Sequence, residues 1–202
     1  METEEIREKK EPKRLPVWAC ILLFALGLFV CMGLYGTIGF GLLSLILGDE
    51  ARHPGLLVYT VTEANMLLSV LTPAVILLYF ERRPFSDLGL TLKGHVRGLW
   101  YGLLVAMLLY LIGFGLSLAI GEVAVTGFQF DPLNLLGTFV FCLLVALTEE
   151  IMMRGYILGR LLHTRMNKFL ALFVSALLFA LLHIFNPNVA FLPMLNLVIA
   201  GM

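Results

Sequence analysis

The sequence predicts an all-α fold, a polytopic transmembrane helical bundle with five spans and the start of a sixth. Of its 202 residues, 60% are hydrophobic and only 14% are charged, and the mean hydropathy is +0.95. A soluble domain is typically about half apolar and a quarter charged. The apolar residues form runs that reach the length of about 20 residues needed to cross a bilayer as a helix. The expected spans are residues 15–47, 56–80, 98–120, 133–162, 168–185 and 189–202.

Three of these runs have informative ends. The first is uncharged for over 30 residues, so we interpret it as one span followed by an interfacial or re-entrant glycine-rich piece, residues 33–48. The fourth run begins at Asp131-Pro132, which is typical of an N-cap followed by proline at the first helical position. The last run is about 14 residues long, which is too short to cross a membrane.

The basic residues predict the orientation and the domain organisation. Five precede the first span, four lie in residues 81–97 and four lie in residues 154–168, so 13 of the 14 fall on one side of the membrane. The positive-inside rule makes that side cytoplasmic. We therefore expect a charged cytoplasmic segment at residues 1–14 and a transmembrane domain at residues 15–202. Because the net charge is zero and the N-terminal segment mixes acids with bases, we expect the bilayer as a partner and no nucleic acid.

Two adjacent glutamates, Glu149 and Glu150, interrupt the fourth span, and His183 is the one ionisable residue of the apolar run 169–185. A carboxylate at the centre of a membrane helix costs about 2.5–3.5 kcal/mol on insertion scales. Such residues normally face a bundle interior, where they bind or transform something. These residues are therefore the main indication of function.

The spacing places Glu149 and His183 at the same depth on neighbouring helices. If the fourth and fifth spans form an antiparallel hairpin with its turn at residues 164–167, Glu149 lies 17 residues before Met166 and His183 lies 17 residues after it. At 1.5 Å per residue, both lie roughly 25 Å from the turn. This is the spacing that a site shared by two helices requires.

Two i, i+4 pairs indicate how the helices are rotated. Glu150 and Arg154 have this spacing, so we expect them to form an ion pair on one face of the helix. Glu149 points about 100° away and is left for chemistry. On the fifth span, Phe179 shares a face with His183, where its ring would support the site by limiting access of water.

A carboxylate and a histidine at one level predict a hydrolase, with the glutamate as general base and the histidine as a second polarising group or a metal ligand. Two alternatives stay open. A shorter span, residues 133–148, would place Glu149, Glu150 and Arg154 at the level of the lipid headgroups. Independently of this, the position of His183 near the far end of its span is also that of an interfacial histidine. Both alternatives together would leave residues 149–162 outside the membrane, although this stretch is apolar enough for a membrane helix.

Other features inside the spans are interpreted as packing or solvated residues. Gly98 and Gly102, and likewise Gly155 and Gly159, have the spacing that allows helices to approach closely. Glu63 lies about seven residues from the outer end of the second span, where we expect it to be solvated.

Two motifs resemble those of a known family. Glu149-Glu150-Ile151-Met152-Met153-Arg154 matches the Glu-Glu-x-x-x-Arg motif of the CAAX protease and bacteriocin-processing (CPBP) family of intramembrane proteases, and Phe179-Ala180-Leu181-Leu182-His183 matches its Phe-x-x-x-His motif. The segment Arg82–Leu90 resembles the usual entry into the family's third span. The resemblance covers a protease-like core from about residue 80 to residue 202.

The resemblance implies a membrane-embedded endopeptidase, similar to CAAX prenyl proteases and to bacteriocin-processing enzymes, acting on a membrane-associated peptide or protein. It implies that Glu149 activates water, that His183 assists or binds a metal, and that Glu150 and Arg154 organise the site. Two mechanisms are then open: a metalloprotease with Zn²⁺ held by Glu149 and His183, or a glutamate-dependent protease without metal. It also implies an integral protein of the bacterial plasma membrane.

The chain departs from the family pattern after His183. The family has a later helix with a His-x-x-x-Asn or His-x-x-x-Asp motif, and no histidine follows His183. A catalytic zinc site usually has three protein ligands, and Glu149 and His183 supply two. We therefore expect this sequence to be a truncated fragment with an incomplete site.

Two other classes of function remain as alternatives. One is a non-catalytic membrane protein of the same fold, such as a bacteriocin self-immunity or scaffold protein. The other is a small proton-coupled transporter that uses Glu149, Glu150 and His183 as a relay.

Overall fold

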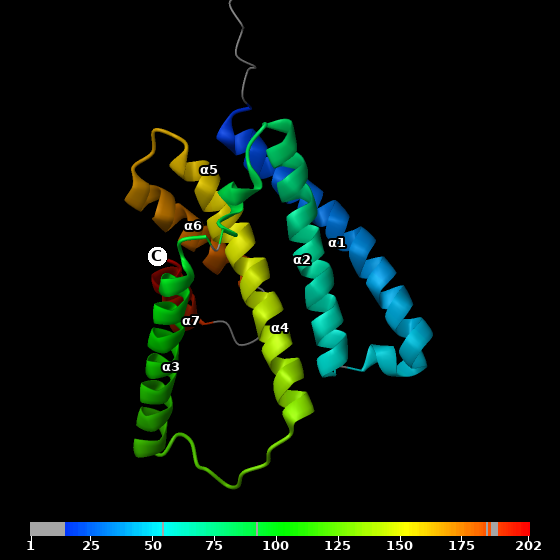
Figure 1. Cartoon of the computed structure of the whole chain (residues 1–202), viewed down its shortest axis with the longest axis vertical. Helices are drawn as coiled ribbons and strands as arrows, with labels where there is room; N and C mark the ends of the chain where they lie inside the picture. The colour runs from blue at the N-terminus through cyan, green and yellow to red at the C-terminus, as the bar shows by residue number, and fades with distance from the viewer. Residues whose placement is uncertain (1–14, 54, 92, 185, 187–189) are drawn as a thin grey trace, which may run out of the picture.

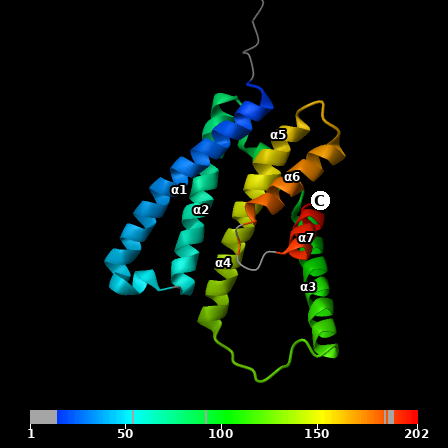
Figure 2. The same ribbon diagram turned by 180° about the vertical axis from the view of Figure 1, so that it is seen from behind.

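The computed structural model describes residues 15–53, 55–91, 93–184, 186 and 190–202, and the predicted segment 1–14 lies outside these residues. Helices are the regular secondary structure of the described residues, which confirms the predicted all-α class. Figure 1 shows α1, α2 and α4 as neighbouring long helices, with α3 standing apart from them. Figure 2 shows α6 crossing the upper part of the α4–α5 segment on the face turned away in Figure 1.

The first run forms one uninterrupted helix, α1 (Val17–Leu47), followed by a short 3-10 helix, η1 (Gly48–Arg52). The expected re-entrant piece at residues 33–48 is therefore wrong. The glycines there do not break the helix, because its backbone N–H groups bond to preceding carbonyls, and Gly48, at φ 58°, is the residue that ends it. α2 (Leu56–Phe80) returns along α1 and also contacts α4.

A connection with a 3-10 turn, η2 (Phe85–Leu88), leads to α3 (Val96–Ala119). None of the residues of α3 is buried against the rest of the described chain. Gly98 and Gly102 meet no atom within 4 Å of an added Cβ, so their predicted role in close helix packing is wrong within the described residues. α3 thus contributes an apolar surface rather than part of the core.

The fourth span is continuous from α4 (Pro132–Glu150) through η3 (Ile151–Leu158) to α5 (Gly159–Leu162). Its start is the predicted one, since the Asp131 carboxylate accepts hydrogen bonds from the backbone N–H groups of Leu133 and Asn134. Its middle differs from a regular helix, because the eight residues of η3 are π-helical. In a π-helix each N–H bonds to the carbonyl five residues back, which widens the turn.

α6 (Lys168–Leu182) returns along this span after a turn at residues 163–167, as predicted, and α7 (Phe191–Gly201) packs on α6. The predicted fifth span is shorter than expected, since α6 has 15 residues. It rises about 22 Å, less than the roughly 30 Å of a bilayer core. His183 consequently lies at the C-terminal cap of α6 rather than inside a longer helix.

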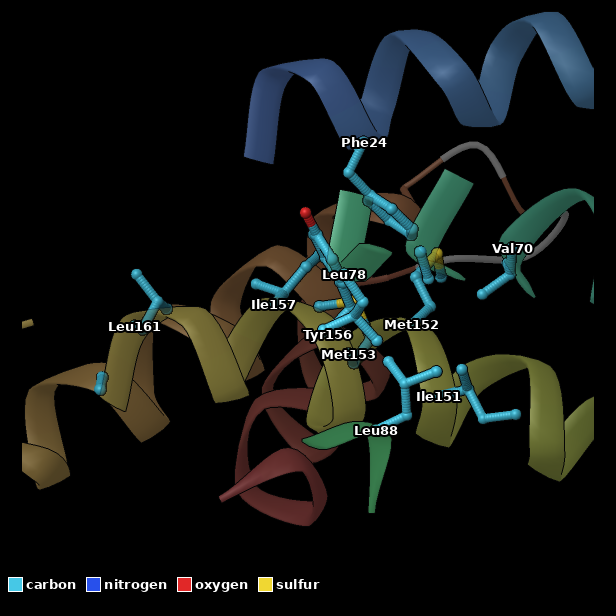
Figure 3. Close-up of a cluster of buried hydrophobic side chains, with 12 residues drawn as sticks. Phe24, Val70, Leu78, Leu88, Ile151, Met152, Met153, Tyr156, Ile157 and Leu161 are labelled. Carbon is cyan, nitrogen blue, oxygen red and sulfur yellow. The ribbon is translucent and has the colours of Figure 1, made fainter. Parts of the chain in front are cut away.

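The core lies where η3 meets α1, α2 and η2. Figure 3 shows Tyr156 of η3 beneath Phe24 of α1, with Leu88 of η2 on the other side of the η3 backbone. The two rings stack with centroids 4.3 Å apart. Gly155 permits the approach of η2, because a Cβ there would lie 2.6 Å from the carbonyl oxygen of Leu88. The predicted close approach at Gly155 is confirmed, although its neighbour is a turn rather than a helix.

Four helical segments are long and apolar enough to cross a membrane: Val17–Arg52, Leu56–Phe80, Val96–Ala119 and Pro132–Leu162. The molecule is an integral membrane protein. The start of α1, the end of α2 and the α5–α6 turn lie at the same end of the structure (Figure 1). The cytoplasmic assignment of that end stays a prediction from the basic residues.

Candidate active site

Glu149 and His183 come together from two different helices. Glu149 lies in the last turn of α4, and His183 lies at the end of α6. The Oε1 atom of Glu149 is 3.5 Å from Nε2 of His183, and both side chains are partly buried. The contact predicted from equal distances to the turn is therefore observed, although α6 is shorter than expected.

The end of α6 fixes the orientation of the imidazole. Nδ1 of His183 lies 2.9 Å from the carbonyl oxygen of Phe179. A carbonyl oxygen only accepts hydrogen bonds, so Nδ1 carries the hydrogen and donates it. This bond satisfies one of the carbonyls left unpaired in the last turn of a helix. Nε2 is thereby the ring nitrogen directed at Glu149.

The aromatic ring of Phe179 lies beside the imidazole, as predicted. The two ring centroids are 4.6 Å apart, with an angle of 60° between the ring planes. Both residues are partly buried, so the ring covers one face of the imidazole. Phe179 therefore limits the positions of His183 through both its carbonyl and its ring.

Glu150 and Arg154 form the predicted ion pair across one turn. The structure shows a further partner of Arg154, because its Nη2 donates a hydrogen bond of 3.3 Å to the carbonyl oxygen of Ala200 in α7. Arg154 thereby joins η3 to the C-terminal end of α7, where unpaired helix carbonyls and the helix dipole favour a cation. The side chains of Glu150 and Arg154 are more exposed than that of Glu149.

The π-helical segment is a feature of the site that the sequence analysis missed. It starts directly after Glu150 and contains Arg154. The hydroxyl group of Ser175 in α6, which is buried, donates a hydrogen bond of 3.2 Å to the carbonyl oxygen of Met153. In the sequence, the sign of this contact is Ser175 itself, a hydroxyl residue inside the apolar run two turns before His183. This bond ties α6 to η3 and helps to hold both halves of the site together.

A third carboxylate, Glu63 of α2, also belongs to these surroundings. It lies within electrostatic range of Glu149, as does Glu150. Glu63 is partly buried, and its solvation at the membrane interface stays a prediction. The site is thus bordered by α2 as well as by the two helices that carry the motifs.

The predicted zinc site is incomplete in the described part of the chain. Glu149 and His183 offer one oxygen and one nitrogen, and their separation of 3.5 Å suits two ligands of one ion. However, no three histidine, cysteine, aspartate or glutamate side chains of the described residues are placed so that together they could hold a metal ion. The donor set found there does not fit a catalytic zinc ion, which usually takes three protein ligands.

Comparison with known proteins finds one similarity, in the C-terminal part of the chain. Residues 131–202 match the family model described as "Type II CAAX prenyl endopeptidase Rce1-like". No curated protein and no solved structure matches the chain. The matched region contains α4, η3, α5, α6 and α7, and so both motifs. Over these residues the chain is therefore similar to the Rce1-like CAAX prenyl endopeptidases, which form a family of membrane proteases.

Proposed function

We propose that the protein is an intramembrane endopeptidase that cleaves membrane-associated peptides or proteins of the prenylated CAAX type. The observation that supports this most directly is the approach of Glu149 to His183, 3.5 Å between Oε1 and Nε2, within the region that matches the family model. Both groups lie at the ends of helices whose other residues are mostly apolar, so the reaction would take place beside the bilayer rather than in bulk water.

In the proposed reaction, a water molecule binds between Glu149 and Nε2 of His183. Glu149 takes a proton from this water while its oxygen attacks the scissile carbonyl carbon, and the C=O electron pair moves to the carbonyl oxygen. When the tetrahedral intermediate collapses, the C–N bond breaks and Glu149 returns the proton to the leaving nitrogen. His183, held by the Phe179 carbonyl, orients the water and stabilises the charge that develops.

Glu150 and Arg154 are positioning residues in this proposal. Their pair, together with the bond from Arg154 to Ala200, keeps η3 and α7 in register. The complete donor set for zinc is not present in the described residues, so the proposal uses no step through a metal.

The proposal is tested by following cleavage of a fluorogenic farnesylated CAAX peptide by the full chain in liposomes. General acid–base catalysis typically contributes about 10²–10⁴-fold to the rate, so Glu149→Gln and His183→Ala should lower kcat by at least about 100-fold. The matched controls are Glu50→Gln and His53→Ala, which change exposed residues of η1 and its cap. Cleavage that persists in either site variant contradicts the mechanism.

The same experiment tests the class of substrate. An identical peptide without the farnesyl group should be cleaved with a much lower kcat/KM, because the lipid group holds the peptide at the membrane. Equal cleavage of both peptides would contradict the CAAX-type assignment while leaving the endopeptidase activity intact. Proton-coupled transport with no cleavage of either peptide would instead support the transporter alternative.

A further inference from the structure

A cavity of about 320 Å³ lies at the end of the molecule that holds the start of α1, the end of α2 and the α5–α6 turn. Three arginines line it, Arg83, Arg160 and Arg165, together with His163 and a single carboxylate, Glu81. Arg160 follows Glu149 by eleven residues along the same helical segment. The cavity is therefore separate from the candidate active site.

Arg160 is the most unusual member of the lining. It is a charged residue with an exposed fraction of only 5%, inside a mostly apolar part of the chain. One of its terminal nitrogens, Nη1, pairs with Glu81, and its guanidinium carbon lies 4.9 Å from the centre of the Tyr156 ring. Its other terminal nitrogen, Nη2, is buried and has no hydrogen-bond partner among the described residues. A buried donor without a partner is costly, which makes Arg160 the least satisfied charged group of the lining.

The charges around the cavity do not balance. Glu81 is shared between Arg160 and Arg83, with Nε of Arg83 3.7 Å from its carboxylate. Arg83 also pairs with Asp87 at 3.1 Å, outside the lining. Arg165 is exposed, and the described residues form no ion pair with it. The three arginines therefore exceed the two carboxylates by one positive charge, counted without His163.

The chemistry of this lining suits an oxyanion. A guanidinium group presents several N–H donors in a plane, an arrangement that matches the oxygens of a phosphate group. The lining also includes apolar residues at the start of α1, namely Leu15, Pro16 and Val17, and Cys20, whose thiol donates a hydrogen bond of 2.8 Å to Glu81. A basic lining that also holds apolar residues, at the end of membrane helices, is the setting in which basic pockets bind lipid headgroups.

We propose that this cavity binds a phosphate group, with Arg160 and Arg165 as its main ligands. Two sources share this chemistry: the headgroup of an anionic phospholipid, whose acyl chains would lie along the start of α1, and free inorganic phosphate. The ligand would balance the excess positive charge of the lining and would hold α1, α2 and the α5–α6 turn together.

Native mass spectrometry of the full chain in a neutral detergent tests the proposal and separates the two sources. The chain is titrated in turn with phosphatidylglycerol, phosphatidylcholine and inorganic phosphate. Preferential retention of phosphatidylglycerol identifies the lipid as the source, and retention of inorganic phosphate at comparable concentrations identifies free phosphate. Retention of none of them, or equal retention of both lipids without phosphate, overturns the proposal.

Arg165→Gln is the decisive variant, because its side chain is exposed and its loss leaves the buried pairs intact. Removal of one basic group near a membrane surface should weaken binding about fivefold. Arg97→Gln, at an exposed position in the first turn of α3, removes the same charge away from the cavity and should leave binding unchanged. An equal effect of both substitutions would mean that general charge attraction holds the ligand, and would overturn the assignment to this cavity.

Arg160→Gln supplies a second measurement. In the unsubstituted chain, added phosphatidylglycerol or phosphate should raise the midpoint of thermal unfolding, since a ligand that binds only the folded state stabilises it. The increase should disappear in Arg160→Gln if that variant folds. If it does not fold, Arg165→Gln still decides the question by the binding assay.

Discussion

At the scale of single residues, the two glutamates of the motif have different surroundings. Glu149 lies against His183, whereas Glu150 pairs with Arg154, which in turn reaches the carbonyl of Ala200 in α7. A guanidinium group can serve both partners at once because its donors are spread over a planar fork. A lysine at this position has one terminal nitrogen on a flexible stem and would not hold both in the same geometry.

We therefore expect Arg154→Lys to lower kcat for peptide cleavage about 10–100-fold, the loss typical when a residue that orients a catalytic ligand is changed. The free energy of unfolding should change by less than about 1 kcal/mol, because the Glu150–Arg154 pair is partly exposed. Steady-state kinetics and reversible unfolding in detergent provide the two readouts. A normal kcat in Arg154→Lys would show that the bridge to α7 does not position the site.

At the scale of elements, the π-helical turn and the approach of η2 define the centre of the molecule. The approach depends on Gly155, which lies within η3 and meets the Leu88 carbonyl oxygen. An added methyl group would stand 2.6 Å from that oxygen, and a backbone atom cannot move away as a flexible side chain does. The glycine is thus required by a close approach rather than by a special backbone angle.

Gly155→Ala should accordingly lower the free energy of unfolding by about 1–3 kcal/mol, as overpacking of a core typically does. Gly102→Ala in α3 is the matched control, since no atom lies within 4 Å of its added Cβ, and its stability should be unchanged or slightly raised. Both values are measured by reversible unfolding in detergent. Equal stability of the two variants would contradict the contact between η2 and η3.

Sequence reasoning reached some elements and missed others, for physical reasons. The equal depth of Glu149 and His183 is predictable, because the rise of a helix depends only on the number of residues and the position of the turn between the two helices follows from the sequence. The π-helical turn was not predictable in this way, since its widened hydrogen bonding depends on contacts such as Ser175 with Met153. The sequence analysis counts Arg160 among the basic residues of segment 154–168. A buried arginine cannot be told from an exposed one in the sequence, and the structure shows the burial of Arg160 through its pairing with Glu81.

At the scale of the whole molecule, the ionic cluster of Arg160, Glu81 and Arg83 joins α5 to the end of α2 at one end of the structure. This is the end that the distribution of basic residues predicts to be cytoplasmic. The opposite end carries the connection between α3 and α4, residues 120–131, which contains no basic residue. The orientation can therefore be tested with one residue at each end.

We expect a cysteine at position 166, in the α5–α6 turn, to be protected from a membrane-impermeant maleimide in intact cells and to react after permeabilisation. A cysteine at position 125, in the connection before α4, should react in intact cells. The residues now at these positions, Met166 and Val125, are exposed. The three native cysteines are replaced by alanine beforehand, so that only the introduced cysteine can react. The reverse pattern of labelling would show that the N-terminus is not cytoplasmic.

The central claim is that Glu149 and His183 act as one unit on a single water molecule. Groups that work together in one step lose most of their effect when either is removed, so their single and double variants resemble one another. The direct measurement is kcat/KM for a farnesylated CAAX peptide in Glu149→Gln, His183→Ala and the double variant. We predict that kcat/KM of the double variant is about as low as that of the slower single variant. A double variant whose loss in kcat/KM equals the product of the two single losses would contradict the claim, as would a single variant that still cleaves the peptide.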